Sequence, residues 1–474
     1  MEKNRSKKTK NKRNSIVVNL KNRNRKKQKR NKSKLLILIC FIILVLVVSI
    51  IIVSKVKKPK FVDLYANIFH DVYKEENIDI NKYIIYGNHF NLEGVSENIY
   101  TIDEVKDIKL ILKSLDGGKK FKYPIKYNLK EKNLSFTSSE LINDGIDLEK
   151  LPIGVYIVLI DVEHYNEIHR MYTLTNMTEY PNTKYYTISK NEKNNEINIG
   201  FDKYKSDSGK EFEYMYIKVQ EATLPEDVYD IVIDAGHGGT DVGAVNGKYE
   251  EADIVLNYAI KLKSELEKIG LKVFLTRNGT EDEKEKMAYT MYDENGRVNE
   301  ANKSKAKYSL SLHLNSNSED ISSGGVEIYA PSKSDLTFAK SLADNIVNIA
   351  NTSYSKVTDY KKTDGVYVEN FTKAVIESFR KRAVKDGYEP YNLTTDTPYL
   401  YMIRELGGIC TNAFVDGRNT DYGANKYINS NIGLEAYLLE LGYINFDKDL
   451  DNILENQDLY VQAIVKSVQE ELFF

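Results

Sequence analysis

The stretch Ile-Val-Ile-Asp-Ala-Gly-His-Gly-Gly, residues 231–239, decides the fold of the C-terminal half of this chain. Its apolar run predicts a short buried strand, and its glycines predict a tight turn where the strand ends. His237 then projects from the rim of a sheet. A histidine framed by glycines at such a rim is a candidate for binding or chemistry.

Strand-like and helix-like segments alternate after residue 228. The segment 252–270 has apolar residues on one helical face, and Gly270 supplies a stop signal at its end. Further strands are expected at 271–276, 309–313 and 324–330, and further helical segments at 297–308 and 334–350. Such alternation builds a mostly parallel sheet with helices on both faces. We therefore predict an α/β domain at 228–474.

Residues 60–222 follow a different pattern. Short strand-like runs such as 108–115 and 154–162 are separated by Gly, Asn and Asp, and no long helical pattern follows residue 75. Evenly spaced short strands are typical of an antiparallel β-sandwich. We predict a sandwich-like accessory domain at 60–222, which serves as a spacer or recognition module.

The N-terminus carries a membrane signal. Residues 35–53 form an apolar run without a charged residue, about as long as a helix that crosses a ~30 Å hydrocarbon core. A lysine-rich stretch follows it instead of a small-residue cleavage site, so we predict a retained transmembrane helix at 35–54. About sixteen Lys or Arg precede it, against the single acid Glu2. This bias predicts a single-pass protein of the cell membrane, with residues 1–34 as a basic cytoplasmic tail and the rest outside.

Two further features bear on partners and on compartment. The basic tail fits an orientation signal that also attracts anionic lipid; a nucleic-acid tail is the alternative, but aromatic stacking residues do not interleave with its charges. We therefore expect a membrane partner and no nucleic acid. The two cysteines, Cys40 and Cys410, provide no disulfide framework for the exterior part.

Four residues with metal chemistry are expected to meet at one edge of the α/β sheet. His237, His313 and Glu440 each end a predicted strand, and Glu251 opens the helix after the first strand. Ligand sites of open α/β sheets lie outside the carboxyl ends of their strands. Two imidazoles and one carboxylate form a well-known zinc set with an open fourth position, which is typical of catalytic sites. Glu440 would then be the base that takes a proton from water.

Each residue also has an ordinary structural interpretation. A histidine at a strand end is often a satisfied structural residue, and Glu251 could simply be an acid at the positive end of a helix dipole. Glu440 is harder to explain in that way, because it follows Tyr437, Leu438 and Leu439 on a strand that should be buried. A carboxylate at the edge of a core is costly unless it is paired or used.

The segment from 229 to about 472 resembles zinc-dependent N-acetylmuramoyl-L-alanine amidases of the amidase-3 family. The motif "IDAGHGGTDVGA" matches the family's opening motif, "EEADIVL" its glutamate ligand, "SLHLNS" its second histidine, and "LLELGYIN" its catalytic glutamate. The lysine of the family's Glu-Lys-Asp context is replaced by Ala252, and Glu250 leaves the register open by one residue. The family's Gly-Phe-(Leu/Ile)-Ser-Asn ending is also shortened, to Gly442–Asn445.

The resemblance implies a peptidoglycan hydrolase that cleaves the amide between N-acetylmuramic acid and L-alanine. It implies one zinc per chain, held by His237, Glu251 and His313, with Glu440 as the catalytic residue. We further expect Asp234, Arg297 and Asn315 to contact a metal ligand or the substrate. The alternatives are a wall-binding protein that has lost hydrolysis and a zinc peptidase that cuts within the stem peptide.

The long segment 355–433, which is polar and aromatic near its end, is expected to form a lid or a glycan-contact surface.

Overall fold

The computed structural model describes residues 60–62, 77–96, 105–115, 118–130, 133–165, 167–175, 183–187, 194–205, 211–279, 296–317, 324–387, 393–406 and 432–473. Within these ranges no helix has the length and apolar character needed to cross a membrane. The transmembrane helix predicted at 35–54 and the basic tail at 1–34 lie outside the described residues.

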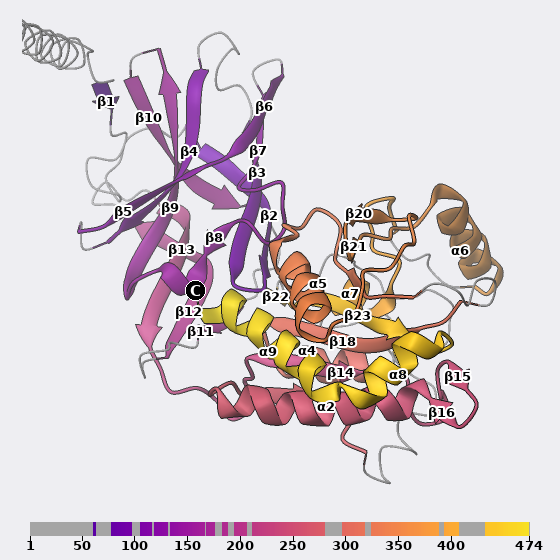
Figure 1. Ribbon diagram of the computed structural model, residues 1–474. Coiled ribbons are helices and arrows are strands. Elements are labelled where there is room, and N and C mark those ends of the chain that lie inside the picture. Colours follow the sequence, from indigo (N-terminus) through magenta and orange to yellow (C-terminus); the bar gives the residue numbers. More distant parts are fainter. Residues whose placement is uncertain are drawn as a thin grey trace, which may run out of the picture. The chain divides into compact units, whose positions relative to one another are not determined.

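The N-terminal β part, residues 77–221, consists of strands and one short 3-10 helix wherever the structure describes it (Figure 1). Most of its strand pairs are antiparallel, whereas β2 and β10 pair in parallel. The elements up to residue 221 are β1 (Lys60–Val62), β2 (Asn77–Tyr86), β3 (His89–Ser96), β4 (Val105–Ser114), β5 (Lys120–Pro124), β6 (Lys126–Lys130), β7 (Asn133–Thr137), β8 (Ile146–Asp147), η2 (Leu148–Lys150), β9 (Gly154–His164), β10 (Glu167–Thr175), β11 (Thr183–Thr187), β12 (Asn195–Lys205) and β13 (Glu211–Glu221).

One hydrophobic cluster forms the core of this β part. Strand β9 contributes alternate residues to it, including Tyr156, Val158 and Ile160, because successive side chains of a strand point to opposite faces. The pairings connect the strands into a single sheet instead of two separate ones. The strand content agrees with the predicted all-β character, whereas one continuous sheet stands where a sandwich of two sheets was predicted.

Helices and strands alternate in the α/β part, residues 228–473. Its elements are β14 (Ile231–Ala235), β15 (Val245–Asn246), β16 (Tyr249–Glu250), α2 (Glu251–Lys268), β17 (Val273–Leu275), α4 (Arg297–Lys303), β18 (Tyr308–Asn315), β19 (Glu327–Tyr329), α5 (Thr337–Ile349), β20 (Lys361–Thr363), β21 (Val366–Tyr367), α6 (Lys373–Lys385), α7 (Tyr401–Leu406), β22 (Ile432–Gly433), β23 (Glu435–Tyr443), α8 (Asp447–Glu455) and α9 (Gln457–Phe473). The predicted strand at 231–233 and the predicted helix at 252–270 are confirmed, and Gly270 follows the helix at φ +90°.

The seven-stranded sheet of this part has the order β17-β14-β18-β23-β19-β21-β20. Strands β17, β14, β18 and β23 run parallel to one another, and β19 runs antiparallel to β23. The carboxyl ends of β14, β18 and β23 therefore meet at one edge. Strand β22, which precedes β23, pairs instead with β2 of the N-terminal β part.

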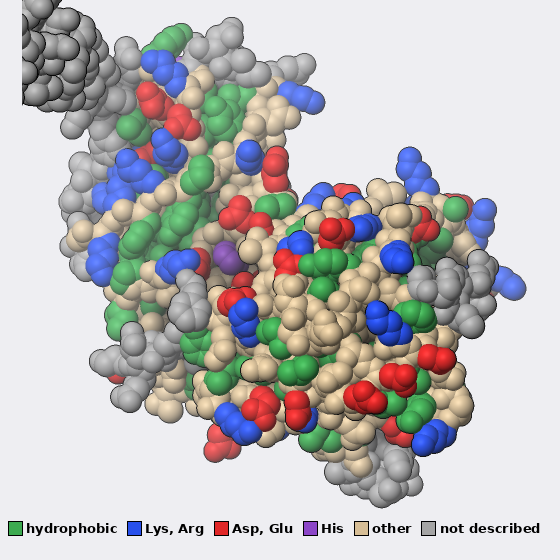
Figure 2. All heavy atoms as spheres, in the orientation of Figure 1, with side chains coloured by type: hydrophobic (Ala, Val, Ile, Leu, Met, Phe, Trp, Pro, Cys, Tyr) green, Lys and Arg blue, Asp and Glu red, His purple; other side chains and the backbone are tan. Residues whose placement is uncertain are grey.

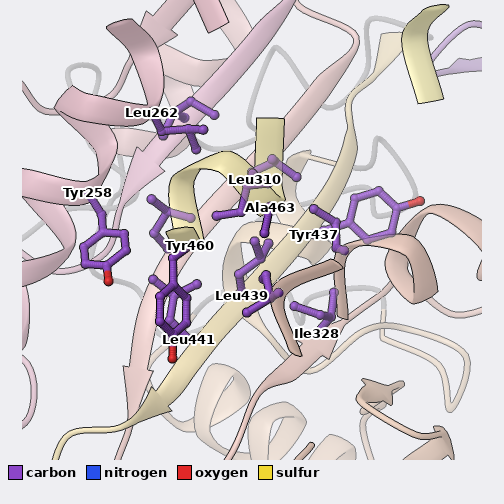
Figure 3. Close-up of a cluster of buried hydrophobic side chains, with 14 of the residues drawn as sticks. Tyr258, Leu262, Leu310, Ile328, Tyr437, Leu439, Leu441, Tyr460 and Ala463 are labelled. Carbon is purple, nitrogen blue, oxygen red and sulfur yellow. The ribbon is translucent and has the colours of Figure 1, made fainter. Parts of the chain in front are cut away.

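Helices cover both faces of the sheet. Ile231 and Ile233 pack into a cluster with residues of α2, α5 and α9, whereas Val232 packs with α4 and α7 on the other side. Figure 3 shows Leu439 and Leu441 of β23 in the first cluster, with Leu439 next to Ile328 of β19. Residues 440 and 327 therefore belong to the opposite face. In Figure 2, acidic and basic side chains are interspersed over the exposed side of the helices.

The lid predicted for 355–433 is wrong for the part of that segment that forms α7. Met402 and Leu406 are buried in the cluster that covers one face of the sheet, so α7 belongs to the core. Val366 and Tyr367 are equally buried because β21 is a strand of the sheet. Residues 407–431, which include much of the polar and aromatic stretch, lie outside the described residues.

Glu435 is an acid inside the fold, and it makes stability depend on pH. Its side chain is 1% exposed, and its Oε1 accepts hydrogen bonds from Tyr437 and from Asn143, the latter at 2.8 Å. Burial raises the pKa of Glu435 to about 7, with Glu471 and Asp335 adding to the effect. Because the folded-state pKa is the higher one, the unfolded chain releases this proton first, and stability is lost as pH rises from about 4.5 to about 7.

Replacing Glu435 with Gln removes this ionisation and keeps an oxygen for the two donors. We expect the Glu435→Gln protein to exceed the wild type in unfolding free energy by on the order of 2–3 kcal/mol at pH 8, and by little at pH 4.5. Urea unfolding at the two pH values measures the difference. An equal difference at both values would show that ionisation of Glu435 is not its cause.

Candidate metal and catalytic site

The turn after β14 brings His237 to the sheet edge in a constrained backbone conformation. His237 has φ +59°, a left-handed value that is uncommon for residues other than glycine, and Gly238 and Gly239 also have positive φ. Gly236 has no room for a side chain, because a Cβ there would lie 2.4 Å from the imidazole of His313. Backbone strain of this kind persists where surrounding structure enforces it, and it is concentrated at functional sites.

Three side chains converge at this edge, as the sequence predicts. Glu251, the first residue of α2, places Oε1 3.1 Å from His237 Nε2 and 3.0 Å from His313 Nδ1. Suitable atoms of the three residues all lie within 4.8 Å of one another. Glu251 is 3% exposed, whereas Glu250 precedes the helix as its N-cap residue. The structure thus brings Glu251, and not Glu250, to the two histidines.

The arrangement fits a zinc ion. Ligand atoms that lie 2.0–2.1 Å from a tetrahedral zinc are roughly 3.3 Å from one another, close to the two separations at Glu251 Oε1. Burial lowers the pKa of His313, which favours the neutral imidazole that a ligand needs, whereas the pKa of His237 is raised, against the effect of burial, by its contacts with Glu251 and Asp241. The role of the three residues as zinc ligands stays a prediction that this geometry supports.

Neighbouring groups hold these side chains in place. His237 Nδ1 lies 2.9 Å from Asp241 Oδ2, so its Nε2 faces Glu251. Glu251 accepts backbone hydrogen bonds from Leu314 at Oε1 and from Ala244 at Oε2, both at 2.9 Å. A carboxylate on the far nitrogen of a metal-binding histidine orients the ring and increases its basicity.

Asp234 lies beneath the turn and is fully buried. Its oxygens accept hydrogen bonds of 2.6 Å from Thr276 and Ser311, and Arg297 Nε lies 3.1 Å from Oδ1. Burial alone would raise the pKa of Asp234, but Arg297 and the two hydroxyls hold it below its ordinary value. Arg297 also donates a 2.8 Å hydrogen bond to the His237 carbonyl. Asp234 therefore acts on the turn indirectly, because it pairs with Arg297, which bonds to the turn.

Glu440, on β23, lies beside His313. It is the direct neighbour of His313 on β18 and of Glu327 on β19. Its Oε2 atom is buried and has no hydrogen-bond partner among the described residues. Burial raises the pKa of Glu440 well above its ordinary value, and the carboxylates of Glu251 and Glu327 raise it further. A carboxylate with such an environment binds a proton readily.

Sequence reasoning missed three contributors. Asp241 lies four residues after His237 in the same motif, and that spacing was the available signal. Glu327 and Tyr443 carried no such signal, because their contacts join separate strands. Asn315 is predicted to contact a metal ligand or the substrate, and its Nδ2 donates a 3.1 Å hydrogen bond to Glu327.

The sequence of the α/β part is similar to those of known proteins. Residues 231–384 match the model of a family described as N-acetylmuramoyl-L-alanine amidase. The germination-specific N-acetylmuramoyl-L-alanine amidase of Bacillus subtilis (strain 168) is 32% identical over 165 residues, which are 33% of this chain and 68% of that protein. The chain belongs to the N-acetylmuramoyl-L-alanine amidase family. The matched residues include His237, Glu251 and His313, whereas Glu440 follows them.

Solved amidase structures align with 52% of the chain. The catalytic domain of the amidase CwlV from Bacillus (Paenibacillus) polymyxa var. colistinus is 24% identical, with 98% of its chain covered and a TM-score of 0.33. An N-acetylmuramoyl-L-alanine amidase from Clostridium difficile 630 is 21% identical, with 98% of its chain covered and a TM-score of 0.34.

Proposed function

We propose that the α/β part hydrolyses the amide bond between N-acetylmuramic acid and the first L-alanine of the peptidoglycan stem peptide. In this proposal one zinc ion is held by His237, Glu251 and His313, and Glu440 is the general base. Family membership supports the reaction. The observation that carries the mechanism is the convergence of the three donor atoms next to Glu440 on the neighbouring strand.

In this proposal each residue of the site has a role that its surroundings support. A zinc ion in this position would lower the pKa of its water to roughly 7 and polarise the substrate carbonyl. Glu440 takes a proton from water and passes it to the nitrogen of the leaving amine. Its raised pKa suits both transfers, because a general acid–base group works best when its pKa lies near the working pH. Asp241 fixes the ring of His237, and Arg297 fixes the turn that carries it.

The products of digestion test the reaction. Purified peptidoglycan is incubated with the part of the protein that follows the membrane segment, and the new termini are identified. We expect new amino groups on L-alanine. New amines at another stem-peptide bond would support a zinc peptidase instead, and binding without new termini would support a wall-binding protein.

We also propose that the protein is anchored in the cell membrane with the amidase part on the wall side. The charge asymmetry around residues 35–54 supports this topology. Protease added to intact protoplasts should then remove the large C-terminal part, because the membrane does not shield it. Full protection of that part until the protoplasts are lysed would refute the topology.

A further inference from the structure

The strand that carries Glu440 contains an irregularity immediately after this residue. His313 pairs with Glu440, and the next pair is Asn315 with Tyr443, so β23 uses three steps where β18 uses two. Gly442, inside this β-bulge, has φ +154°. Bulges bend a strand and redirect its side chains, and they are over-represented next to active sites. The orientation of the Glu440 side chain therefore depends on how rigid this bulge is.

Glu327 is placed to hold it. It lies directly opposite Glu440 in the antiparallel pair of β19 and β23, and directly opposed residues point to the same face. Ile328, its neighbour, packs into the core on the other face. The Glu327 side chain is 1% exposed. A carboxylate this deep is costly unless hydrogen bonds compensate for the lost water.

Three hydrogen bonds compensate, and two of them reach other strands. Glu327 Oε1 accepts from the Tyr443 hydroxyl at 2.5 Å, and Oε2 accepts from Asn315 Nδ2 at 3.1 Å. The third donor is Tyr329, on β19 itself, at 2.8 Å. Asn315 and Tyr443 are the first pair after the bulge. One carboxylate thus connects both strands at the last pair, which lies beyond the bulge.

We propose that Glu327 is a positioning residue that clamps this bulge and thereby holds Glu440 in line with His237, Glu251 and His313. The inference rests on the proposed function for its catalytic consequence, while the clamp itself is a property of the fold. Glu327 does not contact the substrate in this account. Its loss should therefore slow the chemical step and leave substrate binding and metal content nearly unchanged.

Kinetics of the full chain on purified peptidoglycan test the catalytic consequence. Glu327→Gln keeps the size of the side chain but replaces one of the two acceptor oxygens with an NH2 group. At least one of the present hydrogen-bond donors then faces another donor. We expect kcat to fall roughly 10- to 100-fold, since displacement of a catalytic group by about 1 Å costs up to ~10²-fold. The KM and the zinc content should remain close to those of the wild type. An unchanged kcat, or a kcat loss that only follows zinc loss, would overturn the proposal.

Two tyrosine variants form a matched pair. Tyr443→Phe removes the hydrogen bond that reaches β23, and it should lower kcat as Glu327→Gln does; the double variant should lower it little further. Tyr329→Phe removes a 2.8 Å hydrogen bond to the same carboxylate that stays within β19, and it should retain most activity. The two tyrosine variants also test the clamp if Glu327→Gln does not fold. Equal effects of the two tyrosine variants would contradict a clamp across the bulge.

Amide hydrogen exchange of the metal-free protein provides a readout besides activity. The Tyr443 amide donates to Asp449 at 2.9 Å, and the Ile444 amide donates to the Asn315 carbonyl at 2.8 Å. Exchange at these amides should be faster in Glu327→Gln and Tyr443→Phe and unchanged in Tyr329→Phe. Unchanged exchange in Glu327→Gln and Tyr443→Phe would refute the clamp, whether or not the wild type has amidase activity. A wild type without amidase activity would refute only the proposed function.

Discussion

Replacing Glu440 with Gln is expected to lower kcat by at least about a hundredfold while the protein keeps its fold and its zinc. General acid–base groups usually contribute ~10²–10⁴-fold, and the amide of Gln cannot take up the proton. Burial and two nearby carboxylates already disfavour the ionised form of Glu440. A neutral side chain of the same size should therefore leave stability unchanged or slightly higher.

Three measurements on one preparation separate the possible roles of Glu440: turnover on purified peptidoglycan, the thermal unfolding midpoint and the zinc content. Near-normal turnover in Glu440→Gln would show that this carboxylate is not the base. Loss of zinc would show that it is a ligand. Only slow turnover in a folded, zinc-loaded protein agrees with the role proposed here.

Replacing His313 with Ala is expected to remove most of the bound zinc and, with it, nearly all activity. The remaining set of His237 and Glu251 would provide two ligands, whereas catalytic zinc sites use three protein ligands. Metal analysis after dialysis measures the loss. Full retention of zinc by His313→Ala would contradict the assignment.

Two adjacent acids provide a matched control for the metal site. Glu251 lies between the two histidines, whereas Glu250 is outside the cluster, so Glu251→Ala should lose zinc and Glu250→Ala should keep it. The reverse result would move the ligand by one residue. Both substitutions remove one negative charge near the start of α2, so the dipole of that helix cannot explain a difference between them.

The main elements of the α/β part could be predicted because local patterns determine them. The apolar run at 231–233, the helical periodicity of 252–269 and the stop at Gly270 all correspond to observed elements. Strand ends then placed His237 and His313 at one edge, since parallel neighbours share their carboxyl ends. The convergence of Glu251 with both histidines depends on more than that rule, because the connection from β14 to α2 spans 236–250 and contains the hairpin of β15 and β16.

Other features depend on contacts between distant residues, which no local pattern records. The bulge after Glu440 becomes visible only when β18 is paired with β23, and the three hydrogen bonds of Glu327 join residues on three strands. The segment 355–433, which contains α7, was expected to form a lid or a glycan-contact surface because of its position and its polar and aromatic stretch. The six residues of α7 are too few for periodicity to identify a buried face, which tertiary packing determines.

Zinc titration of the metal-free protein tests the central claim most directly. The rate at which amino groups appear on L-alanine in purified peptidoglycan is measured as zinc is added in known amounts per chain. We expect almost no release without metal and a rate that rises linearly until one zinc per chain is bound. Equal release by the metal-free protein, or a rate that does not respond to zinc, would contradict a zinc-dependent amidase.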